Sequence, residues 1–303
     1  MNRILIVGSG DIAMRAIPLL SRRYQVYALA RNPEYFEKLR AAGSMPVLGD
    51  LDDRTSLSRI AGLADAVLHF APPPNIGMRD TRTRNLLTTL SLTSLRQARR
   101  RTLPKRMIYI STSGVYGDCQ GAMVDETHKL AATSPRSQRR MDAEIQIRHW
   151  ARRNRVNASI LRVPGIYAAD RLPVSRLQKG APAIIASEDS YTNHINADDL
   201  ARICLAALLR GKPCRVYHTS DDSDLKMGEY FDCVADAFGL PRAPRISREE
   251  AQSALSPMML SFMNESRRMS NQRMKRELKV KLRYPTVADT LAAIKLADVP
   301  ASR

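Results

Sequence analysis

A glycine-rich turn near the start of the chain is the feature that most constrains its fold. Residues 3–7 form a short, largely apolar run, and Gly8-Ser9-Gly10-Asp11-Ile12-Ala13 follows it directly. In such a turn the first glycine permits a sharp change of direction, and the second lets a pyrophosphate approach the backbone. The small last residue lets the next helix pack on the strand, with its first N–H groups facing the phosphate. The pattern predicts a dinucleotide-binding βα turn in preference to an ordinary one.

The segments that follow predict a parallel sheet with helices on both faces. Helical patterns separate the apolar runs, and this alternation is typical of βαβ units. Pro18 lies inside the first expected helix and predicts a kink or an early end, because proline lacks the N–H that a helix needs. Later helical patterns cover residues 199–210, 227–239 and 286–297. The expected strands after the first are residues 25–30, 45–50, 66–71, 106–111 and 157–163.

Composition indicates a globular protein with a large core. The chain has 303 residues, of which 44% are hydrophobic, and no apolar run approaches the length of a bilayer span. The N-terminus leads straight into a strand pattern, which differs from a signal peptide. Its four cysteines show neither C-x-x-C spacing nor a nearby histidine pattern, so we expect reduced thiols, a cytoplasmic location and no metal site.

The net charge of +18 raises the alternative of nucleic-acid binding. Two observations weigh against it: the basic residues are spread along the whole chain, and only one tryptophan and five phenylalanines could stack on bases. The densest basic run, at residues 96–101, is expected to end a helix, where cations favour the helix dipole. Binding of a phosphate-bearing ligand is a second use for some of these arginines.

The end of the second strand bears on cofactor choice. An acid about twenty residues beyond the glycines would bind the ribose 2′-hydroxyl of NAD, whereas an arginine there suits the 2′-phosphate of NADP. The sequence here is Ala30-Arg31-Asn32, and no acid occurs before Glu34. Arg31 therefore favours NADP, while NAD and a purely surface role for Arg31 stay open.

Several segments together resemble the extended short-chain dehydrogenases/reductases, the NAD-dependent epimerase/dehydratase family. The resemblance extends from residue 1 to about residue 296, with its motifs in the family's order, and is closest to atypical members regarded as sugar-nucleotide epimerases or reductases. The segments that carry it are Ile110-Ser111-Thr112-Ser113-Gly114-Val115-Tyr116-Gly117-Asp118, Ile160-Leu161-Arg162-Val163-Pro164-Gly165-Ile166-Tyr167, His194-Ile195-Asn196-Ala197-Asp198-Asp199-Leu200-Ala201 and Val216-Tyr217-His218-Thr219-Ser220-Asp221.

This resemblance implies an α/β fold: a Rossmann-type doubly wound parallel sheet with a smaller C-terminal substrate lobe. We expect the dinucleotide-binding core at residues 1–165, with elements from about 194–221 returning to it, and mainly the substrate lobe at 166–303. The expected cofactor contacts add Asp50, Leu51 and Ala71, which end or follow the third and fourth strands, to the glycine-rich turn, Arg31 and Arg140. The acids Asp198 and Asp199 are expected to cap the helix that follows them.

The standard active site of that family is incomplete in this chain. Its chemistry rests on a Tyr-x-x-x-Lys pair and a Ser or Thr, and none of the ten tyrosines has a lysine four residues later. In the matching segment Arg136 stands at the Tyr position and Arg140 at the Lys position. Arg140 can contact a ribose or phosphate, or can pair with Glu144 one turn later. Arg136 cannot act as a general acid near neutral pH.

Two residues are candidate replacements for the missing tyrosine. Tyr116 lies close to Thr112, the residue that matches the family's hydroxyl position. His128 titrates near neutral pH and lies in a loop expected to lead toward the site. Asp125 and Glu126 are further candidates, and a structural role is the alternative for each.

Three hypotheses result, in order of preference. The first is an NADP-binding oxidoreductase or epimerase-like enzyme that acts on a small polar substrate, with a nucleotide sugar as one candidate, through non-standard acid/base residues. The second is a binding module that holds NADP(H) without turnover, as a redox sensor or assembly subunit. The third and weakest is nucleic-acid binding. No membrane partner is expected, and a homodimer stays open. A basic cluster could bind a substrate diphosphate or form a solvated face: Arg267, Arg268, Arg273, Lys275 and Arg276.

Overall fold

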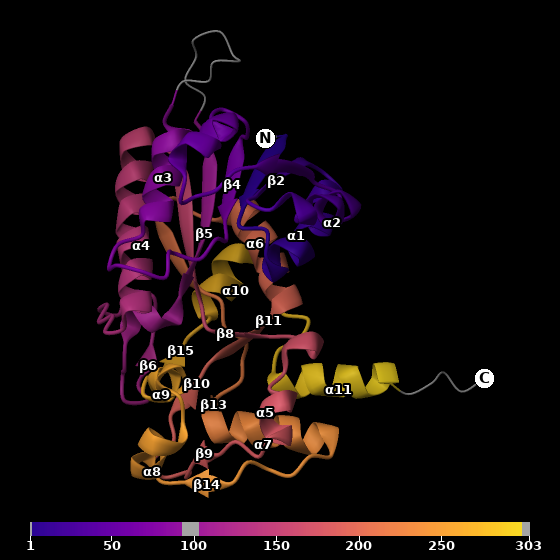
Figure 1. The fold of residues 1–303 in the computed structure, drawn as a ribbon, viewed down its shortest axis with the longest axis vertical. Coiled ribbons are helices and arrows are strands. Elements are labelled where there is room, and N and C mark those ends of the chain that lie inside the picture. Colours follow the sequence, from indigo (N-terminus) through magenta and orange to yellow (C-terminus); the bar gives the residue numbers. More distant parts are fainter. Residues whose placement is uncertain (1, 93–102, 299–303) are drawn as a thin grey trace, which may run out of the picture.

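A seven-stranded parallel sheet forms the centre of the molecule (Figure 1). The computed structural model describes residues 2–92 and 103–298, so the basic run at 96–101 lies outside the described residues. Neighbouring strands follow the order β12-β7-β5-β4-β1-β2-β3. The order reverses direction at β1, and in sheets of this kind ligands bind at the carboxyl ends of the strands beside that point. The strands are β1 (Arg3–Val7), β2 (Gln25–Ala30), β3 (Met45–Leu48), β4 (Ala66–His69), β5 (Arg106–Thr112), β7 (Asn157–Val163) and β12 (Arg215–His218).

Helices cover both faces of this sheet, which confirms the Rossmann-type doubly wound fold. On one face α1 (Asp11–Ser21) packs beside α6 (Ala197–Arg210). On the other, α3 (Thr81–Leu90) packs beside α4 (Pro135–Asn154). The helix α2 (Phe36–Ala41) connects β2 to β3.

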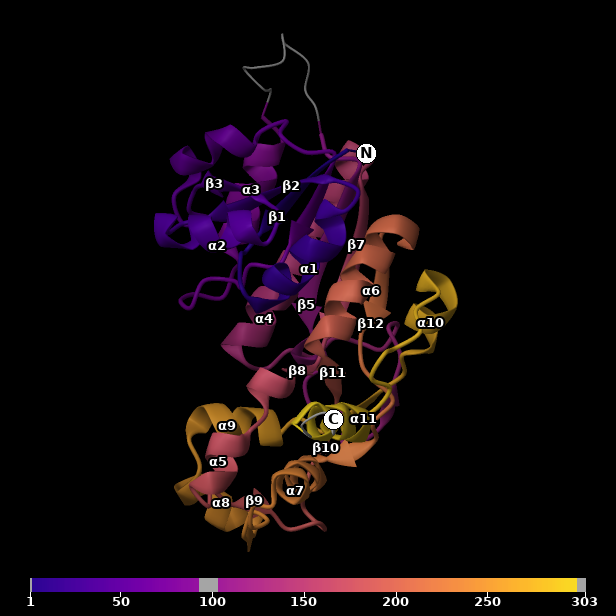
Figure 2. The ribbon, with the colours of Figure 1, turned by 90° about the vertical axis from the view of Figure 1, so that its right-hand side faces the viewer.

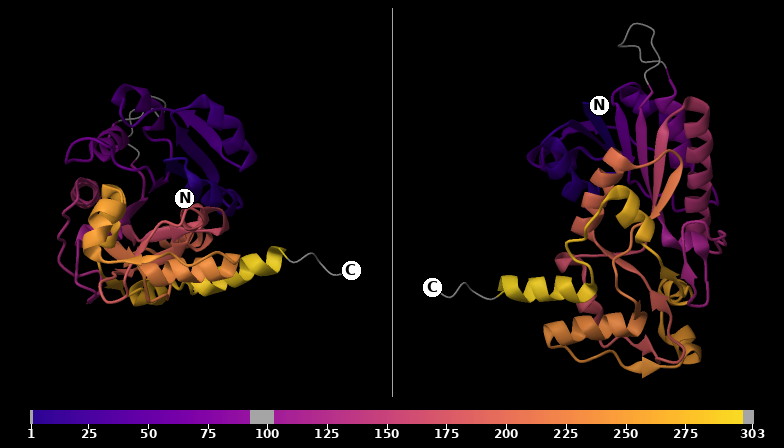
Figure 3. Two further views of the ribbon diagram at one scale, coloured as in Figure 1. Left: turned by 60° about the horizontal axis from the view of Figure 1, so that its bottom comes forward. Right: turned by 180° about the vertical axis from the view of Figure 1, so that it is seen from behind.

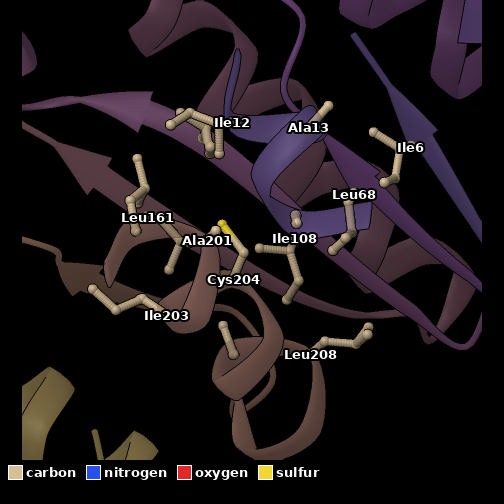
Figure 4. Packing of buried hydrophobic residues seen from close by; sticks show 14 of the residues in the cluster. Ile6, Ile12, Ala13, Leu68, Ile108, Leu161, Ala201, Ile203, Cys204 and Leu208 are labelled. Carbon is tan, nitrogen blue, oxygen red and sulfur yellow. The ribbon is translucent and has the colours of Figure 1, made fainter. Parts of the chain in front are cut away.

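Alternation along the strands divides the core between the two faces. Ile4 and Ile6 of β1 belong to the cluster under α1 and α6, whereas Leu5 and Val7 belong to the cluster under α3 and α4, because successive strand residues point to opposite faces. Figure 4 shows side chains of α1 and α6 packed together against the strands. The labelled residues there are Ile6, Ile12, Ala13, Leu68, Ile108, Leu161, Ala201, Ile203, Cys204 and Leu208.

The sequence placed most of these elements within a few residues. The three later helices are confirmed as α6, α7 (Met227–Phe238) and α11 (Val287–Asp298). Pro18 does not end α1, which continues to Ser21. The expected cap of α6 was wrong: the Asn196 side chain accepts the N–H of Asp198 at 2.9 Å. Asp199 instead accepts the backbone N–H groups of Arg283 and Tyr284.

A second, smaller assembly lies at the carboxyl edge of the sheet (Figures 1 and 2). It has its own apolar cluster, built mainly on α7 and its neighbours, and α11 packs along α7 (Figure 3). Its helices and 3-10 helix are η4 (Ala169–Arg171), α5 (Val174–Gln178), α7, α8 (Arg248–Ala254), α9 (Pro257–Met263) and α11. Its short strands are β8 (Gly165–Tyr167), β9 (Ala183–Ile184), β10 (Tyr191–Thr192), β11 (His194–Asn196), β13 (Leu225–Lys226) and β14 (Arg245–Ile246).

The chain crosses between the two assemblies more than once. After β11 it returns as α6 and β12, and later as α10 (Gln272–Leu278), whose buried Met274 and Leu278 join the cluster beneath α6. The short strand β15 (Arg268–Met269) pairs with β6 (Met123–Val124), which follows β5. These crossings hold the smaller assembly against the carboxyl edge of the sheet. In the ranges 2–92 and 103–298, no helix is long and apolar enough to cross a membrane.

Candidate functional site

Gly8 is required where the first strand turns toward the helix. Its φ of +99° belongs to the region that favours glycine, and a Cβ on it would lie 2.4 Å from the backbone nitrogen of Ala71. The N–H groups of Phe70 and Ala71 donate to the carbonyl of Val7 at 2.7 and 2.9 Å. The chain after β4 is therefore held directly against the turn.

The surroundings of Gly10 differ from those of Gly8, because the space next to its Cα is open. Its φ of −83° suits any residue, and a Cβ there would have no neighbour within 4 Å. Gly10 is the N-cap of α1, and no side chain of the described residues caps that helix. The N–H groups of Asp11, Ile12 and Ala13 precede the first helical hydrogen bond, from Met14 to Gly10. The space and the free donors fit a pyrophosphate.

The other residues of the predicted cofactor set surround this turn with different roles. The Ser9 hydroxyl donates to the carbonyl of Leu29 at 2.7 Å and braces the turn against β2. Asp50 follows β3, and its carboxylate accepts the N–H of Asp52 at 3.0 Å. Leu51 is buried in the core, so its side chain serves packing.

Arg31 stands at the carboxyl end of β2 and is exposed. It makes no hydrogen bond or ion pair with any described residue. The nearby carboxylate of Asp52 is held by Arg82 through two hydrogen bonds of 2.8 and 2.6 Å. These bonds and the charges of Arg82 and Arg31 lower the pKa of Asp52. The guanidinium of Arg31 is therefore left without a close acidic partner.

A cleft of about 560 Å³ opens at the carboxyl ends of β4, β5 and β7. Thr112 and Arg140 line it from the sheet side, and Tyr191 and Phe231 line it from the smaller assembly. The described residues in its wall include a single acid, Glu265. They also include five arginines: Arg136, Arg139, Arg140, Arg176 and Arg267.

Of the three predicted catalytic residues, the structure places only Thr112 in the wall of this cleft. The hydroxyl of Tyr116 is buried in a polar network, 2.5 Å from His218 Nε2 and 2.6 Å from Arg162 Nη1. Burial raises the pKa of Tyr116 to about 12. His128 is exposed, with its Nε2 4.0 Å from the sulfur of Cys119. Neither Tyr116 nor His128 is among the residues that line the cleft, because the polar network holds the Tyr116 hydroxyl and His128 lies in an exposed loop.

The first turns of α4 carry Arg136 and Arg140, the two arginines that the sequence resemblance matches to the family's Tyr and Lys positions. Arg140 Nη1 donates to the Tyr109 hydroxyl at 3.1 Å and to the carbonyl of Ile110 at 2.7 Å, so one nitrogen is fixed to β5. Arg136 lies with its guanidinium carbon 4.2 Å from the centroid of the Phe262 ring. Both side chains line the cleft.

The expected surface pair of Arg140 with Glu144 was wrong. Glu144 is buried on the side of α4 that faces the sheet. Arg162 of β7 donates two hydrogen bonds to its carboxylate, from Nε at 3.0 Å and from Nη2 at 2.7 Å. The Ser111 hydroxyl adds a third, at 2.7 Å. The sequence signal was a lone arginine inside the apolar strand 157–163, which requires a buried partner.

Most of the basic cluster near residue 270 is engaged in ion pairs. Arg273 lies 3.3 Å from Glu126, Lys275 2.5 Å from Asp222 and Arg268 3.6 Å from Asp224. Arg267 alone of this cluster lines the cleft. The residues 2–92 and 103–298 contain no group of three or more His, Cys, Asp or Glu side chains placed to hold a metal ion.

Comparison with known families agrees with this geometry. The sequence profile of the NAD dependent epimerase/dehydratase family matches residues 5–218, from β1 to the end of β12. The chain belongs to this family. Its relatives include the 4-hydroxy-2-methyl-3-oxo-4-farnesyl-3,4-dihydroquinoline-1-oxide ketoreductase of Stigmatella aurantiaca, 31% identical over 135 residues, or 43% of this chain and 39% of that protein. The human dTDP-D-glucose 4,6-dehydratase is 23% identical over 75% of this chain and 71% of its own length.

Solved structures share the whole fold. A conserved protein of unknown function from Silicibacter pomeroyi has a TM-score of 0.80 and 28% identity, covering 98% of this chain and 99% of its own. The dTDP-glucose 4,6-dehydratase DesIV of Streptomyces venezuelae, solved with NAD bound, has a TM-score of 0.74 and 19% identity over 97% of both chains. These likenesses extend beyond the profile match into the smaller assembly.

Proposed function

We propose that this chain binds a nicotinamide dinucleotide at the Gly8–Gly10 turn and uses it on a small polar substrate in the adjoining cleft. The observation that carries the proposal is the open space over Gly10, at a helix N-terminus without a side-chain cap. This turn and the cleft lie on the same carboxyl edge of the sheet. A nucleotide sugar is one substrate candidate, since relatives such as the human dehydratase act on dTDP-glucose.

Within this proposal NADP is the preferred cofactor. Arg31 is exposed beside the expected adenosine ribose, and Asp52, whose pKa its charge lowers, is already paired with Arg82. A 2′-phosphate would give Arg31 the anionic partner that the described chain does not supply.

The chain's own residues have separate tasks at the nicotinamide end. The cofactor supplies hydride transfer when bound. Arg140, fixed to β5 through one nitrogen, has other N–H groups for the ribose. Thr112 Oγ1 accepts the N–H of Gly114 at 3.2 Å, and its own proton can be donated to a substrate oxygen.

Proton transfer needs a donor other than Arg136, and Tyr191 is the residue we propose to test first. Tyr191 lines the cleft, and its ring contacts Arg268 and Lys226 rather than a carboxylate. By contrast, the Tyr167 hydroxyl donates to Asp221 at 3.0 Å. We expect Tyr191→Phe to lower turnover about 10²-fold or more, as loss of a general acid does, with NADPH affinity unchanged.

A non-catalytic NADP(H)-binding module is the second candidate. The observation that favours it is the replacement of the family tyrosine by Arg136, together with the placement of Tyr116 and His128 outside the cleft wall. A protein of this kind would bind the dinucleotide and transfer no hydride.

Two measurements separate these possibilities. Calorimetry with NADPH and NADH tests binding, with Gly10→Val as the control that blocks the pyrophosphate space. A screen of carbonyl compounds and nucleotide sugars, followed by NADPH absorbance, then tests turnover. Binding with turnover supports the enzyme, binding without turnover supports the module, and the absence of binding overturns both.

A further inference from the structure

The cleft wall formed by the start of α4 carries more positive charge than the proposed reaction uses. Five arginines line the cleft, and Glu265 is the one acid among the described lining residues. That acid is already paired, since Arg267 Nη2 lies 2.9 Å from Glu265 Oε2 and both side chains are nearly buried. Within residues 2–92 and 103–298, no carboxylate pairs with the remaining arginines of the cleft.

Arg136 is the clearest of these unmatched cations. Its guanidinium stacks on Phe262 and makes no hydrogen bond or ion pair with any described residue. Stacking occupies a face of the guanidinium and leaves the donors in its plane available. The Arg136 side chain is exposed, so these donors are open to a ligand. Desolvation lowers the pKa of Arg136, and the charge of Glu265 raises it in part.

Two neighbouring arginines have donors that the protein leaves unused. Arg139 and Arg267 are each 7% exposed, and the buried Nε of each has no hydrogen-bond partner. Their terminal nitrogens are held by backbone carbonyls, Arg139 by Gly77 and Arg267 by Gly117, both at 2.6 Å. Unpaired buried donors are costly. Arg267 already has Glu265 as a counterion, whereas Arg139 has no carboxylate partner among the described residues, so its charge favours an anion in the cleft.

We propose that the start of α4 binds an anionic group of the substrate, a carboxylate or a phosphate, with Arg136 as the direct donor and Arg139 as a supporting charge. This inference rests on the proposed function, because it places the anion in the same cleft. Arg136 then binds the substrate at the position where the family motif has its proton-carrying tyrosine. The substrate class becomes acids, sugar acids or sugar phosphates rather than neutral sugars.

Two simple anions test this site without knowledge of the substrate. Malonate represents the carboxylate and inorganic phosphate the phosphate, each titrated by calorimetry into NADPH-saturated protein, with KCl used to hold ionic strength constant. We expect millimolar binding of at least one probe. Arg136→Gln should weaken that binding at least tenfold, since it removes charge-assisted hydrogen bonds.

Two further variants control for charge and folding. Arg152→Gln removes the same charge from the exposed surface of α4, more than four turns away from Arg136, and should bind the probes like wild type. Arg136→Lys retains the charge without the planar fork and should give intermediate affinity. The probe that binds more tightly identifies the carboxylate or the phosphate as the preferred group.

Failure of this inference is distinguishable from failure of the proposed function. NADPH binding is measured first, and its absence would refute the proposed function, whereupon the anion titrations are run on the free protein. Intact NADPH binding with no probe binding, or with equal probe affinity in wild type and Arg136→Gln, would overturn the anion site alone.

Discussion

Gly8 and Gly10 are separated by one residue, yet they are glycines for different reasons. Gly8 has a positive φ and lies against the backbone of Ala71, so the fold itself requires a glycine at this position. Gly10 has an ordinary φ and open space above it, so the fold does not require a glycine here. A ligand that occupies this space would require one. This contrast allows a stability effect to be separated from a binding effect.

Gly10→Val should abolish NADPH binding and leave the fold intact, because its side chain would occupy the pyrophosphate space without meeting protein atoms. Gly8→Ala should instead destabilise the protein, because its Cβ would meet Ala71. Calorimetry for binding and urea unfolding for stability check both outcomes. Full NADPH affinity in Gly10→Val would contradict the location of the cofactor.

Arg31 is expected to set the preference of the protein for NADPH over NADH. If its guanidinium binds a 2′-phosphate, NADPH should raise Tm more than NADH at equal concentration, and Arg31→Ala should remove the difference. Arg23→Ala, which removes an exposed charge beyond the far end of α1, should preserve it. A wild-type preference for NADH would show that Arg31 does not select the cofactor.

The burial of His194 should lower the free energy of unfolding in acid. Burial lowers its pKa from 6.5 to about 3, so between these pH values the unfolded chain binds a proton that the folded chain does not. The contribution of the neutral imidazole is therefore present above about pH 6.5 and is lost as the pH falls toward 3. The slope for one proton is about 1.4 kcal/mol per pH unit.

His194→Phe should remove that slope. The phenyl ring can retain the stacking on Tyr230, whose ring centroid lies 4.1 Å from that of His194, and the imidazole Nδ1 has no partner to lose. Urea unfolding at pH 7 and pH 4.5 should show a smaller acid loss in the variant, by about 2–3 kcal/mol. Equal losses in both proteins would mean that His194 is protonated while folded.

At the scale of elements, a buried polar network joins α4 to the sheet. Arg162 of β7 connects Glu144 of α4 with the Tyr116 hydroxyl, which in turn reaches His218 of β12. Glu144 and Arg162 are 1% and 2% exposed, so neither charge has water as an alternative partner. The energetic value of this pair lies mainly in the cost of separating it.

Arg162→Met should therefore destabilise the protein by about 3–5 kcal/mol. The buried Glu144 carboxylate would lose its closest cation and would be left with the Ser111 hydroxyl and with Arg148, whose Nη2 lies 3.6 Å from Oε2. Adding Glu144→Gln should recover part of that loss by removing the stranded charge. Urea unfolding of the single and double variants measures this coupling. Arg242→Met, at an exposed pair with Asp236, is the control and should cause hardly any change; strictly additive losses would argue against the pairing.

Local patterns in the sequence predicted six of the seven strands of the central sheet, because each of the six has its own apolar run and turn residues. The seventh, β12, was indicated by the family resemblance. The same patterns could not identify the partner of Glu144, since Arg162 is distant in sequence and approaches only through the sheet order. They also missed the cap of α6, because Asp199 is occupied by the backbone near Tyr284. Short-range signals predict elements, whereas charge pairing depends on which elements meet.

In the candidate site too, the contiguous part was predictable from the sequence, and the part built from distant segments was not. The glycine-rich turn is contiguous, so its spacing alone predicted a turn between a strand and a helix, and the structure places it between β1 and α1. The cleft wall is assembled from distant segments, and Arg139, Arg176 and Glu265 gave no local signal. Tyr116 and His128 were singled out by chemistry and by proximity in sequence, which does not show whether a side chain reaches the cleft.

At the scale of the whole molecule, an ionic cluster joins the two assemblies beside the cofactor turn. The guanidinium of Arg15 in α1 pairs with three carboxylates. Its Nε lies 3.1 Å from Asp11 Oδ1, its Nη2 lies 2.8 Å from Asp170 Oδ1, and its Nη1 lies 2.8 Å from Asp198 Oδ1. Arg171 of η4 adds a second cation, 3.0 Å from Asp11. Three carboxylates are thus gathered where an anionic pyrophosphate is expected, and the arginines offset their charge.

Removing Arg15 tests whether this cluster prepares the turn for an anion. Arg15→Gln leaves Asp11 paired with Arg171 and leaves Asp170 and Asp198 without an ion pair among the described residues, so NADPH should bind about tenfold more weakly at 0.05 M KCl. Because the Debye length falls from about 10 Å at 0.1 M to about 3 Å at 1 M, the loss should shrink markedly at 0.5 M KCl. Arg22→Gln, at the other end of α1, should bind NADPH normally in both salts. Calorimetry supplies all six affinities, and a loss of the same size at both salt concentrations would indicate that Arg15 acts by holding the two assemblies in place rather than through its charge.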